Sequence, residues 1–194
     1  RLRPHVKTHK SAAVAELQMA RGIRRFKCAT LSEAAMLARA GCRDVLLAYQ
    51  AVGPTRSGFL DLAGCYPQTR FACLVDNKET LAELERAGRR HAAIAVYLDL
   101  DVGMQRTGIG PGAGAEELYL RIARSAVLKA GGIHAYDGHI HDQDPEERAR
   151  RAGEGRRRAL ELRERLQRRG APVPEIVLGG TATFPYHAAA VATV

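Results

Sequence analysis

Two kinds of segment alternate along the 194 residues, and this alternation constrains the fold more than any other feature. Short runs rich in Val, Ile, Leu or Cys are typical of buried parallel strands. The chain contains seven of them: "PHVK", "RFKCAT", "DVLLA", "RFACLVD", "AIAVYLDLD", "GGIHAYDGHIH" and "EIVLGG". Successive runs begin about 20–40 residues apart, close to the length of a strand–helix–strand unit. The pattern predicts a parallel α/β fold.

Helical stretches separate the predicted strands. They are "SAAVAELQMARG", "LSEAAMLARAG", "TRSGFLDLAG", "NKETLAELERAGRRH", "GAEELYLRIARSA" and a long Arg/Glu-rich stretch from about Glu146 to Arg169. Three of them have an N-cap residue at the start and a glycine where the helix would stop: Ser11 with Gly22, Ser32 with Gly41, and Asn77 with Gly88.

Polar residues gather where the predicted strands end. A (β/α)8 barrel places functional residues at the carboxyl ends of many strands, whereas a doubly wound sheet concentrates them at one switch point. Here they follow every predicted strand: Lys7 and His9, Thr30, Tyr49 and Gln50, Asp76 and Asn77, Asp101 to Arg106, Tyr136 to His141, and Gly179 to Thr181. We therefore expect residues 1–194 to form a single TIM-type barrel domain, with the open sheet as the alternative. Since a complete barrel needs about 250 residues, we expect this one to be incomplete, with "AAAVATV" as the start of an eighth strand.

The net charge of +9 raises the question of nucleic-acid binding, because Lys and Arg contact phosphates. Much of the excess lies in "PEERARRAGEGRRRALELRERLQRRG". There, Glu and Arg are spaced i,i+4 as on a solvated helix: Glu147 and Arg151, Glu154 and Arg158, Glu161 and Arg165, and Glu164 and Arg168. Aromatic residues make up 5% of the chain and none lies in this segment, so it offers no platform for stacking bases. We expect no nucleic-acid partner.

The cysteines indicate a reducing compartment. Cys28, Cys42, Cys65 and Cys73 lack CxxC spacing and lie in or beside apolar segments. This favours reduced, buried thiols over disulfides or a zinc site. No apolar run approaches the roughly 20 residues of a membrane helix, and no leader precedes the first strand. We expect a soluble, cytoplasmic protein whose natural start lies upstream of Arg1.

The segment "HVKTH" sets a lysine between two histidines. Only five of the 30 basic residues are lysine, and a desolvated lysine, unlike arginine, can lose its proton and become a nucleophile. On an extended strand, His5, Lys7 and His9 share one face. Lys7 is therefore the candidate for a Schiff base with an aldehyde, with a solvated strand end as the alternative. Lys10 would lie on the opposite face, in solvent or in electrostatic support.

Two later segments suit anions. In "LDLDVGMQRTGIGPG", Arg106 follows a strand in a glycine-rich turn and suits a phenolate or carboxylate oxygen; the alternative is an exposed arginine at the barrel rim. In "LGGTATF", Gly179 and Gly180 allow backbone N–H groups to approach an anion, and Thr181 adds a hydroxyl. Barrels often hold phosphate in the loops after strands seven and eight. A ligand with both an aldehyde and a phosphate is pyridoxal phosphate.

The segment "AYDGHIHD" allows a metal hydrolase as an alternative. His139 and His141 share one face of the predicted strand, an HxH arrangement used to bind zinc. Barrel hydrolases of that class place HxH at the first strand and add later histidines and an aspartate. Here it ends the sixth strand and His187 is the only later histidine, which disfavours zinc.

The segments "RPHVKTHK", "DVGMQRTGI", "YDGH" and "GGT" together resemble the fold-type III pyridoxal phosphate enzymes. The resemblance is greatest to the D-threonine aldolase and D-serine dehydratase group, related to alanine racemase at the barrel. It implies that Lys7 carries the cofactor through a Schiff base, that Arg106 contacts its phenolic oxygen, and that Tyr136 lies at the pyridine ring. It also implies further contacts: the phosphate with Gly179, Gly180 and Thr181, and the ring or substrate with His139.

The resemblance further implies a lyase of D-amino acid metabolism that acts on D-β-hydroxy-α-amino acids. Retro-aldol cleavage to glycine and an aldehyde is the preferred reaction. The alternatives are a D-serine dehydratase-like ammonia-lyase, an amino-acid racemase and a non-enzymatic carrier of pyridoxal phosphate. The family also has an N-terminal segment and a C-terminal β domain that binds a divalent metal (Mn, Mg or Zn). We expect this chain to be a fragment without them, from a protein that forms a homodimer.

Overall fold

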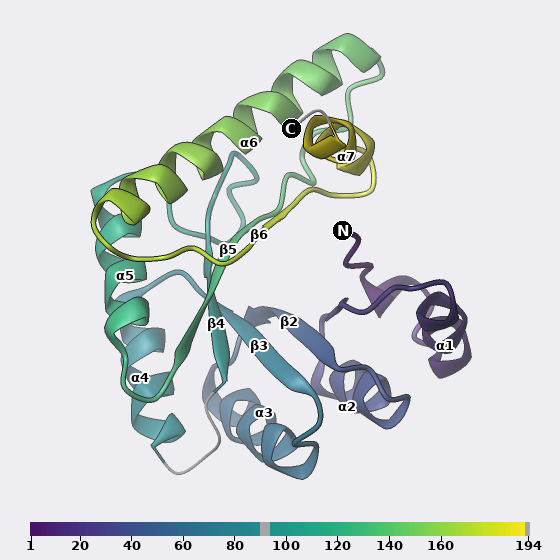
Figure 1. The fold of residues 1–194 in the computed structure, drawn as a ribbon, viewed down its shortest axis with the longest axis vertical. Coiled ribbons are helices and arrows are strands. Elements are labelled where there is room, and N and C mark those ends of the chain that lie inside the picture. Colours follow the sequence, from purple (N-terminus) through teal and green to yellow (C-terminus); the bar gives the residue numbers. More distant parts are fainter. Residues whose placement is uncertain (90–93, 193–194) are drawn as a thin grey trace. The chain divides into compact units, whose positions relative to one another are not determined.

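The computed structural model describes residues 1–89 and 94–192 (Figure 1). Within these residues helices and strands alternate in the order η1 (Val6–Thr8), α1 (Ala12–Ala20), β1 (Phe26–Cys28), α2 (Leu31–Arg39), β2 (Asp44–Gln50), α3 (Gly53–Cys65), β3 (Arg70–Val75), α4 (Lys78–Gly88), β4 (Ala95–Asp99), α5 (Ala113–Arg124), β5 (Lys129–Ala135), α6 (Pro145–Arg168), β6 (Ile176–Leu178) and α7 (Phe184–Ala192). The chain forms two compact units.

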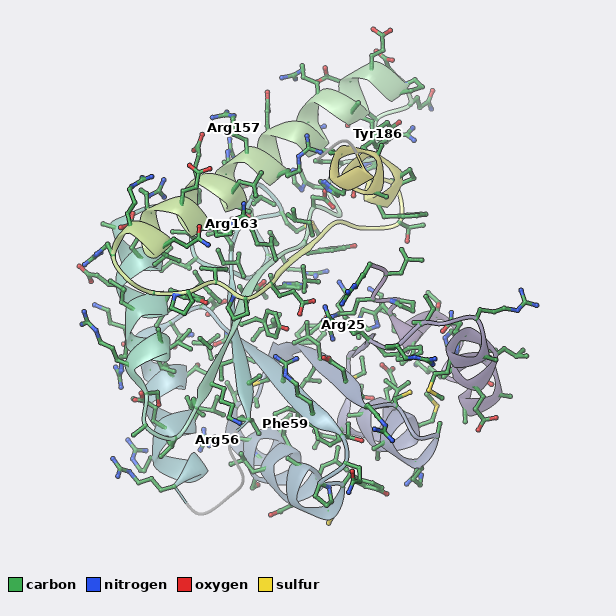
Figure 2. The ribbon with its side chains drawn as sticks, in the orientation of Figure 1. Arg25, Arg56, Phe59, Arg157, Arg163 and Tyr186 are labelled. Carbon is green, nitrogen blue, oxygen red and sulfur yellow. The ribbon has the colours of Figure 1, made fainter. Side chains whose placement is uncertain are left out.

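The first unit comprises Arg1–Val96 and Ser125–Lys129. Its strands β1, β2 and β3 are parallel neighbours in chain order, with Val45 of β2 beside both Phe26 and Phe71. Helix α2 packs on β1 and β2 and also against α3. Phe59 of α3, labelled in Figure 2, packs edge-to-face with Phe71 of β3, with ring centroids 6.0 Å apart. The strands therefore bury one apolar face beneath the helices that connect them.

The second unit comprises Tyr97–Arg124 and Ala130–Val194. Strands β5 and β6 are parallel, with Ile133 beside Ile176. A Cβ at Gly131 would overlap the ring of Tyr97, and Gly132 has φ +135°, so β5 needs both glycines to pack here. Helix α6 packs against α5 and α7. This unit carries the loops after β4, β5 and β6.

The fold is an incomplete (β/α)8 barrel, as the sequence predicts. In each unit the order of the strands in space follows their order along the chain. A helix lies between each pair of consecutive strands. A doubly wound sheet would reverse the strand order at its switch point, so the open-sheet alternative is wrong.

The first predicted strand is wrong. Residues 6–8 form the 3-10 turn η1, and only His5 forms an isolated parallel bridge, to Lys27. The His5 ring accepts a hydrogen bond from the Lys7 N–H (3.2 Å), and the Val6 carbonyl accepts from Lys10 N (2.7 Å). These local bonds bend the chain toward helix α1, so the described residues contain six strands rather than seven.

Three other strand predictions are wrong in whole or in part. The predicted sixth strand ends at Ala135, so residues 136–141 form a loop. Residues 188–192 of "AAAVATV" lie in helix α7 rather than in an eighth strand, and residues 193–194 lie outside the described residues. Tyr49 and Gln50 lie inside β2 rather than beyond it. Ala93, at the start of another predicted strand, lies outside the described residues.

The helix caps are confirmed in part. Ser11 and Asn77 cap α1 and α4. Helix α2 is capped instead by Thr30, whose hydroxyl accepts from Glu33 N (3.2 Å), while the Glu33 carboxylate accepts from Ala29 N (2.7 Å). The arrangement resembles a capping box, except that Glu33 bonds the residue before the cap, and it places the cap two residues before the predicted Ser32.

Helix α6 is the predicted Arg/Glu helix, but its ion pairs differ from those predicted. Arg157, labelled in Figure 2, pairs with Glu161 at 3.0 Å. Arg151 instead pairs with Asp142 (2.8 Å), and Arg165 with Glu116 of α5 (2.6 Å). Contacts with other elements therefore compete with the i,i+4 pattern.

The thiols are free, and all but one are buried as expected. Cys28, Cys42 and Cys73 are buried, whereas Cys65 is exposed. Burial raises the pKa of the Cys73 thiol to about 12. No helix among the described residues is both long and apolar enough to cross a bilayer.

Candidate functional site

Lys7 lies in η1, in the first unit, and its side chain is exposed. Its neighbour Val6 is fully buried and anchors the turn. The extended geometry that would place Lys7 on one face with both histidines is absent from this segment, because residues 6–8 are helical. The prediction that Lys7 and Lys10 lie on opposite faces of a strand is therefore wrong, and it does not distinguish the two lysines. The assignment of Lys7 as nucleophile remains a prediction.

One ring nitrogen of His9 has no hydrogen-bond partner within the described residues. Its Nδ1 accepts a hydrogen bond from Ser11 N (3.1 Å), so in the neutral ring the proton lies on Nε2. That Nε2 is buried and has no hydrogen-bond partner within the described residues. Because a buried donor without a partner costs free energy, this atom is suited to a ligand acceptor two residues from Lys7.

Arg106 lies in a loop that is held by two aspartates. The Asp101 carboxylate accepts from Gly103 N (2.8 Å) and Gln105 N (3.1 Å). At the end of β4, Asp99 accepts from the Thr107 hydroxyl (2.9 Å). These bonds fix the backbone on both sides of Arg106, whose side chain remains exposed.

The structure brings Arg106 and Tyr136 together. The guanidinium carbon lies 5.2 Å from the centroid of the Tyr136 ring, within the range of a cation–π contact. Tyr136 is the first residue after β5. A positive charge and an aromatic face thus lie side by side, an arrangement suited to a planar ring with an anionic oxygen.

His139 also lies in the loop after β5. Its Nδ1 is buried without a hydrogen-bond partner among the described residues. Burial lowers the pKa of His139, and the charge of Arg151 lowers it further. His141 is exposed, and neither residue is in a strand. The zinc interpretation rested on the prediction that the two histidines share a strand face, and that prediction is wrong. The described part of the chain holds no group of three or more His, Cys, Asp or Glu residues that could bind a metal ion.

The glycines after β6 form a tight turn. Gly179 has φ +98°, and a Cβ there would lie 2.8 Å from Cδ2 of His187. A Cβ at Gly180 would lie 3.2 Å from the Tyr136 ring. No hydrogen bond among the described residues uses the N–H groups of Thr181 or Ala182, which precede helix α7. Free N–H groups before a helix are suited to a phosphate.

The role of the Thr181 hydroxyl at this turn remains a prediction, and a second threonine, Thr183, shapes the turn from within. Thr181 is exposed, whereas Thr183 is fully buried and its Oγ1 accepts from Gly180 N (2.9 Å). Thr183 in turn donates to Asp137, which also bonds His187. Sequence reasoning missed Asp137 and Thr183, because they are 46 residues apart. The only sequence signal was that Asp137 lies within "YDGH".

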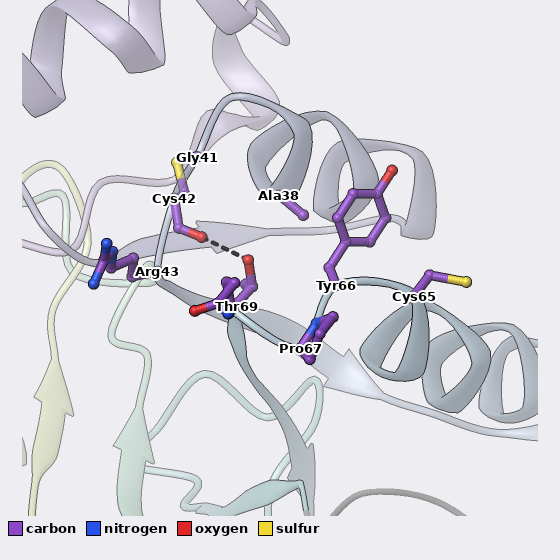
Figure 3. A pocket seen from close by; sticks show the side chains of 9 residues that line it. Ala38, Gly41, Cys42, Arg43, Cys65, Tyr66, Pro67 and Thr69 are labelled. Carbon is purple, nitrogen blue, oxygen red and sulfur yellow. Dashed lines mark hydrogen bonds between the residues drawn. The ribbon is translucent and has the colours of Figure 1, made fainter.

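The structure thus brings Arg106 and the turn of Gly179 and Gly180 to the Tyr136 ring in the second unit, whereas His139 lies beside Gly103, where a Cβ would come within 2.8 Å of its Nε2. A cavity of about 350 Å³ lies elsewhere, in the first unit (Figure 3). Cys42, Arg43 and Thr69 line it just before β2 and β3, and Thr69 Oγ1 donates to the Cys42 carbonyl (2.8 Å). It lies at the amino ends of these strands, whereas barrel sites lie at the carboxyl ends.

Comparison with known proteins places these residues in context. The family model "Alanine racemase, N-terminal domain" matches residues 1–194. The chain is 32% identical to a D-threonine aldolase from Arthrobacter sp. over 195 aligned positions, covering 97% of this chain and 50% of that protein. It is 30% identical to a D-threo-3-hydroxyaspartate dehydratase from Delftia sp. over 190 positions, covering 94% and 48%.

A solved structure is also similar. The crystal structure of D-threonine aldolase from Filomicrobium marinum matches with a TM-score of 0.89 at 32% identity, over 96% of this chain and 50% of that one. The chain spans about half the length of the curated relatives it matches.

Proposed function

The chain belongs to the family of the alanine racemase N-terminal domain, and we propose that it is the barrel of a pyridoxal phosphate-dependent lyase for D-β-hydroxy-α-amino acids. The reaction that we propose first is retro-aldol cleavage to glycine and an aldehyde. The observation that carries this proposal is the 32% identity to a D-threonine aldolase over 97% of the chain.

The residues present fit this cofactor. Lys7 would hold it covalently through the ε-amino group, and Arg106 would bind its phenolic oxygen. Tyr136, already in contact with Arg106, would lie against the ring. Gly179 and Gly180 shape a turn in which the N–H groups of Thr181 and Ala182 suit a phosphate, and Thr181 would also contribute its exposed hydroxyl. When bound, pyridoxal phosphate supplies an electron-poor ring that stabilises negative charge at the substrate α carbon.

His139 would act beside the ring or the substrate. Because burial lowers its pKa, the ring is neutral at pH 7 and can accept a proton. Its Nδ1 has no partner among the described residues, so that atom is available to a substrate hydroxyl. Removal of a proton from the β-hydroxyl is the step that retro-aldol cleavage requires.

Dehydration is the second candidate. The 30% identity to a D-threo-3-hydroxyaspartate dehydratase over 94% of the chain supports it. The two reactions differ in the substrate bond that breaks: Cα–Cβ in the aldolase, and Cα–H followed by loss of the β-hydroxyl in the dehydratase. The relatives named above are an aldolase and a dehydratase, so we prefer a lyase to the racemase and the cofactor carrier.

The proposal extends to metal, assembly and location. We propose that the full-length protein needs a divalent metal (Mn, Mg or Zn), forms a homodimer and acts in the cytoplasm on a small D-amino acid. Chelation with EDTA should lower its activity while leaving the absorbance of bound cofactor unchanged. Light scattering would measure the assembly, and a monomer at working concentration would contradict the homodimer.

The cofactor is tested by spectroscopy and mass mapping. Full-length protein mixed with pyridoxal phosphate should develop an absorbance band at the edge of the visible range. Borohydride reduction and peptide mapping should then locate the pyridoxyl group on Lys7. Lys7→Ala should abolish the band, and the matched control Lys10→Ala should keep it. Absence of the band in the wild-type protein would contradict the proposed function.

The reaction is tested by products. With divalent metal, the holoenzyme should consume D-threonine and leave L-threonine unchanged, because substrate is attacked on one face of the ring. Glycine with acetaldehyde indicates the aldolase, and 2-oxobutanoate with ammonia indicates the dehydratase. Equal use of both enantiomers would contradict both.

A further inference from the structure

A buried carboxylate joins the loop after β5 to the turn after β6. The Asp137 side chain accepts from the Thr183 hydroxyl through Oδ1 (2.7 Å) and bonds Nε2 of His187 through Oδ2 (2.8 Å). The exposed fractions are 1% for Asp137, 0% for Thr183 and 7% for His187. Both carboxylate oxygens are therefore used in holding the segment that begins with the two glycines.

The bonds continue into the backbone of the turn. Thr183 Oγ1 accepts from Gly180 N (2.9 Å) while its proton goes to Asp137. His187 lies against Gly179, where a Cβ would come within 2.8 Å of the ring. Asp137 thus fixes the turn at its start through Thr183 and Gly180, and at the first turns of α7 through His187.

The two N–H groups that remain are those of Thr181 and Ala182, which lie between these fixed points. Burial has the largest single effect on the Asp137 pKa and raises it. The hydrogen bonds from His187 and Thr183 together outweigh burial and hold the pKa below its usual range. The carboxylate is therefore charged at neutral pH. A charged acceptor binds its donors more strongly than a neutral one does.

We propose that Asp137 is a positioning residue for the cofactor phosphate: it touches no cofactor atom, but it holds residues 179–183 in the shape that leaves the Thr181 and Ala182 N–H groups available to the anion. This inference rests on the proposed function. It predicts that Asp137 matters for the phosphate of the cofactor and not for its ring.

The test compares pyridoxal phosphate with pyridoxal, which has the same aldehyde and ring but no phosphate. Each is titrated into the full-length protein and its Kd is taken from the absorbance change. Asp137→Asn keeps the side-chain shape but removes the charge and one acceptor. We expect it to raise the Kd for pyridoxal phosphate about 10-fold or more, as loss of charged hydrogen bonds does, and that for pyridoxal less than about 3-fold.

Asp99→Asn is a matched control. Asp99 is 4% exposed and binds a threonine and a histidine in the same way, through Thr107 (2.9 Å) and His134 (2.7 Å). Its threonine follows Arg106, which is proposed to bind the ring oxygen. Asp99→Asn should therefore raise the Kd values for pyridoxal and pyridoxal phosphate by the same factor. A variant that is merely less stable would also bind both compounds more weakly by the same factor.

Thr183 provides a second pair of variants that does not depend on Asp137→Asn folding. Thr183→Val removes the hydroxyl that links Asp137 to Gly180 and should lose phosphate selectivity. Thr183→Ser restores the hydroxyl and should regain it. An unchanged ratio of the two Kd values in both Asp137→Asn and Thr183→Val, with wild type binding pyridoxal phosphate, would overturn this inference alone. Wild-type protein that binds neither compound would overturn the proposed function and this inference together.

Discussion

Gly179→Ala offers a quantitative test of the turn after β6. The residue has φ +98°, and the added methyl group would lie 2.8 Å from Cδ2 of His187. A side chain in left-handed backbone geometry costs about 1–2 kcal/mol. The His187 ring is buried and is held by Asp137, so a shift of the ring to admit the methyl group would break a hydrogen bond to a charged group, worth about 1.5–3 kcal/mol. We expect the free energy of unfolding to fall by about 2.5–5 kcal/mol, the sum of these two costs.

Gly170→Ala separates these two costs. Gly170 also has a positive φ, +74°, but no atom lies within 4 Å of its added Cβ. Gly170→Ala should therefore lower the free energy of unfolding only by the cost of the left-handed backbone, about 1–2 kcal/mol. The difference between the two variants, about 1.5–3 kcal/mol, corresponds to a difference in Tm of about 3–12 °C for a domain of this size. Urea titration measures the free energies and a thermal melt measures Tm.

A double variant identifies the source of the extra cost. Replacing His187 by Ala removes the ring that the new methyl group meets, so Gly179→Ala in that background should cost no more than Gly170→Ala. Contacting residues show such non-additivity, whereas independent ones add to within about 0.5 kcal/mol. If Gly179→Ala and Gly170→Ala destabilise the wild-type protein equally, the close approach of His187 does not constrain the turn.

Three further predictions concern other parts of the structure. Because the folded pKa of Asp137 lies below its usual value, its contribution to stability is present above the unfolded pKa of about 3.9 and is lost as pH falls below it; urea titrations from pH 7 to pH 3 should show a steeper acid loss for wild type than for Asp137→Asn, and equal slopes would contradict this. Iodoacetamide should modify exposed Cys65 in the native protein well before buried Cys73, whose pKa is raised to about 12; equal rates by peptide mass analysis would refute this order. Gly132→Ala should prevent normal pairing of β5 with β6, since its Cβ would overlap a backbone carbonyl beside β6 at φ +135°; an unchanged Tm would show that the overlap is relieved without cost.

The strands and helices could be predicted because their signals are local. Apolar runs and N-caps depend on residues within a few positions, and each of β1 to β6 overlaps a predicted run, although β2 and β5 extend beyond theirs. The failure at "PHVK" is also local but has another cause. There the His5 side chain bonds the Lys7 N–H, and periodicity carries no information on that bond. Similarly, at the start of α2 the Thr30 hydroxyl accepts from Glu33 N while the Glu33 carboxylate accepts from Ala29 N, and periodicity indicates neither bond.

The candidate site could be predicted only in part. The glycines and the arginine stand out in the sequence because such residues after strands suit anions, whereas the contact between Arg106 and Tyr136 appears only in the structure. The buried threonine of the final turn could not be distinguished from Thr181, because both follow the glycines. What separates them is Asp137, which reaches Thr183 across 46 residues of sequence. Such a contact depends on how β5 and β6 pair, which no local pattern specifies.

Neighbouring strands of the second unit use the same device at their carboxyl ends. At β4 and after β5, a buried aspartate binds one loop hydroxyl and one imidazole: Asp99 with Thr107 and His134, and Asp137 with Thr183 and His187. A buried ion pair is weak evidence for stability, because desolvation offsets much of the attraction. A carboxylate with two oxygens can, however, fix two elements at once. The first aspartate thereby holds the loop of Arg106 to rigid strands, and the second holds the turn proposed to bind phosphate. Positioning of these two loops explains the buried charges better than stability does.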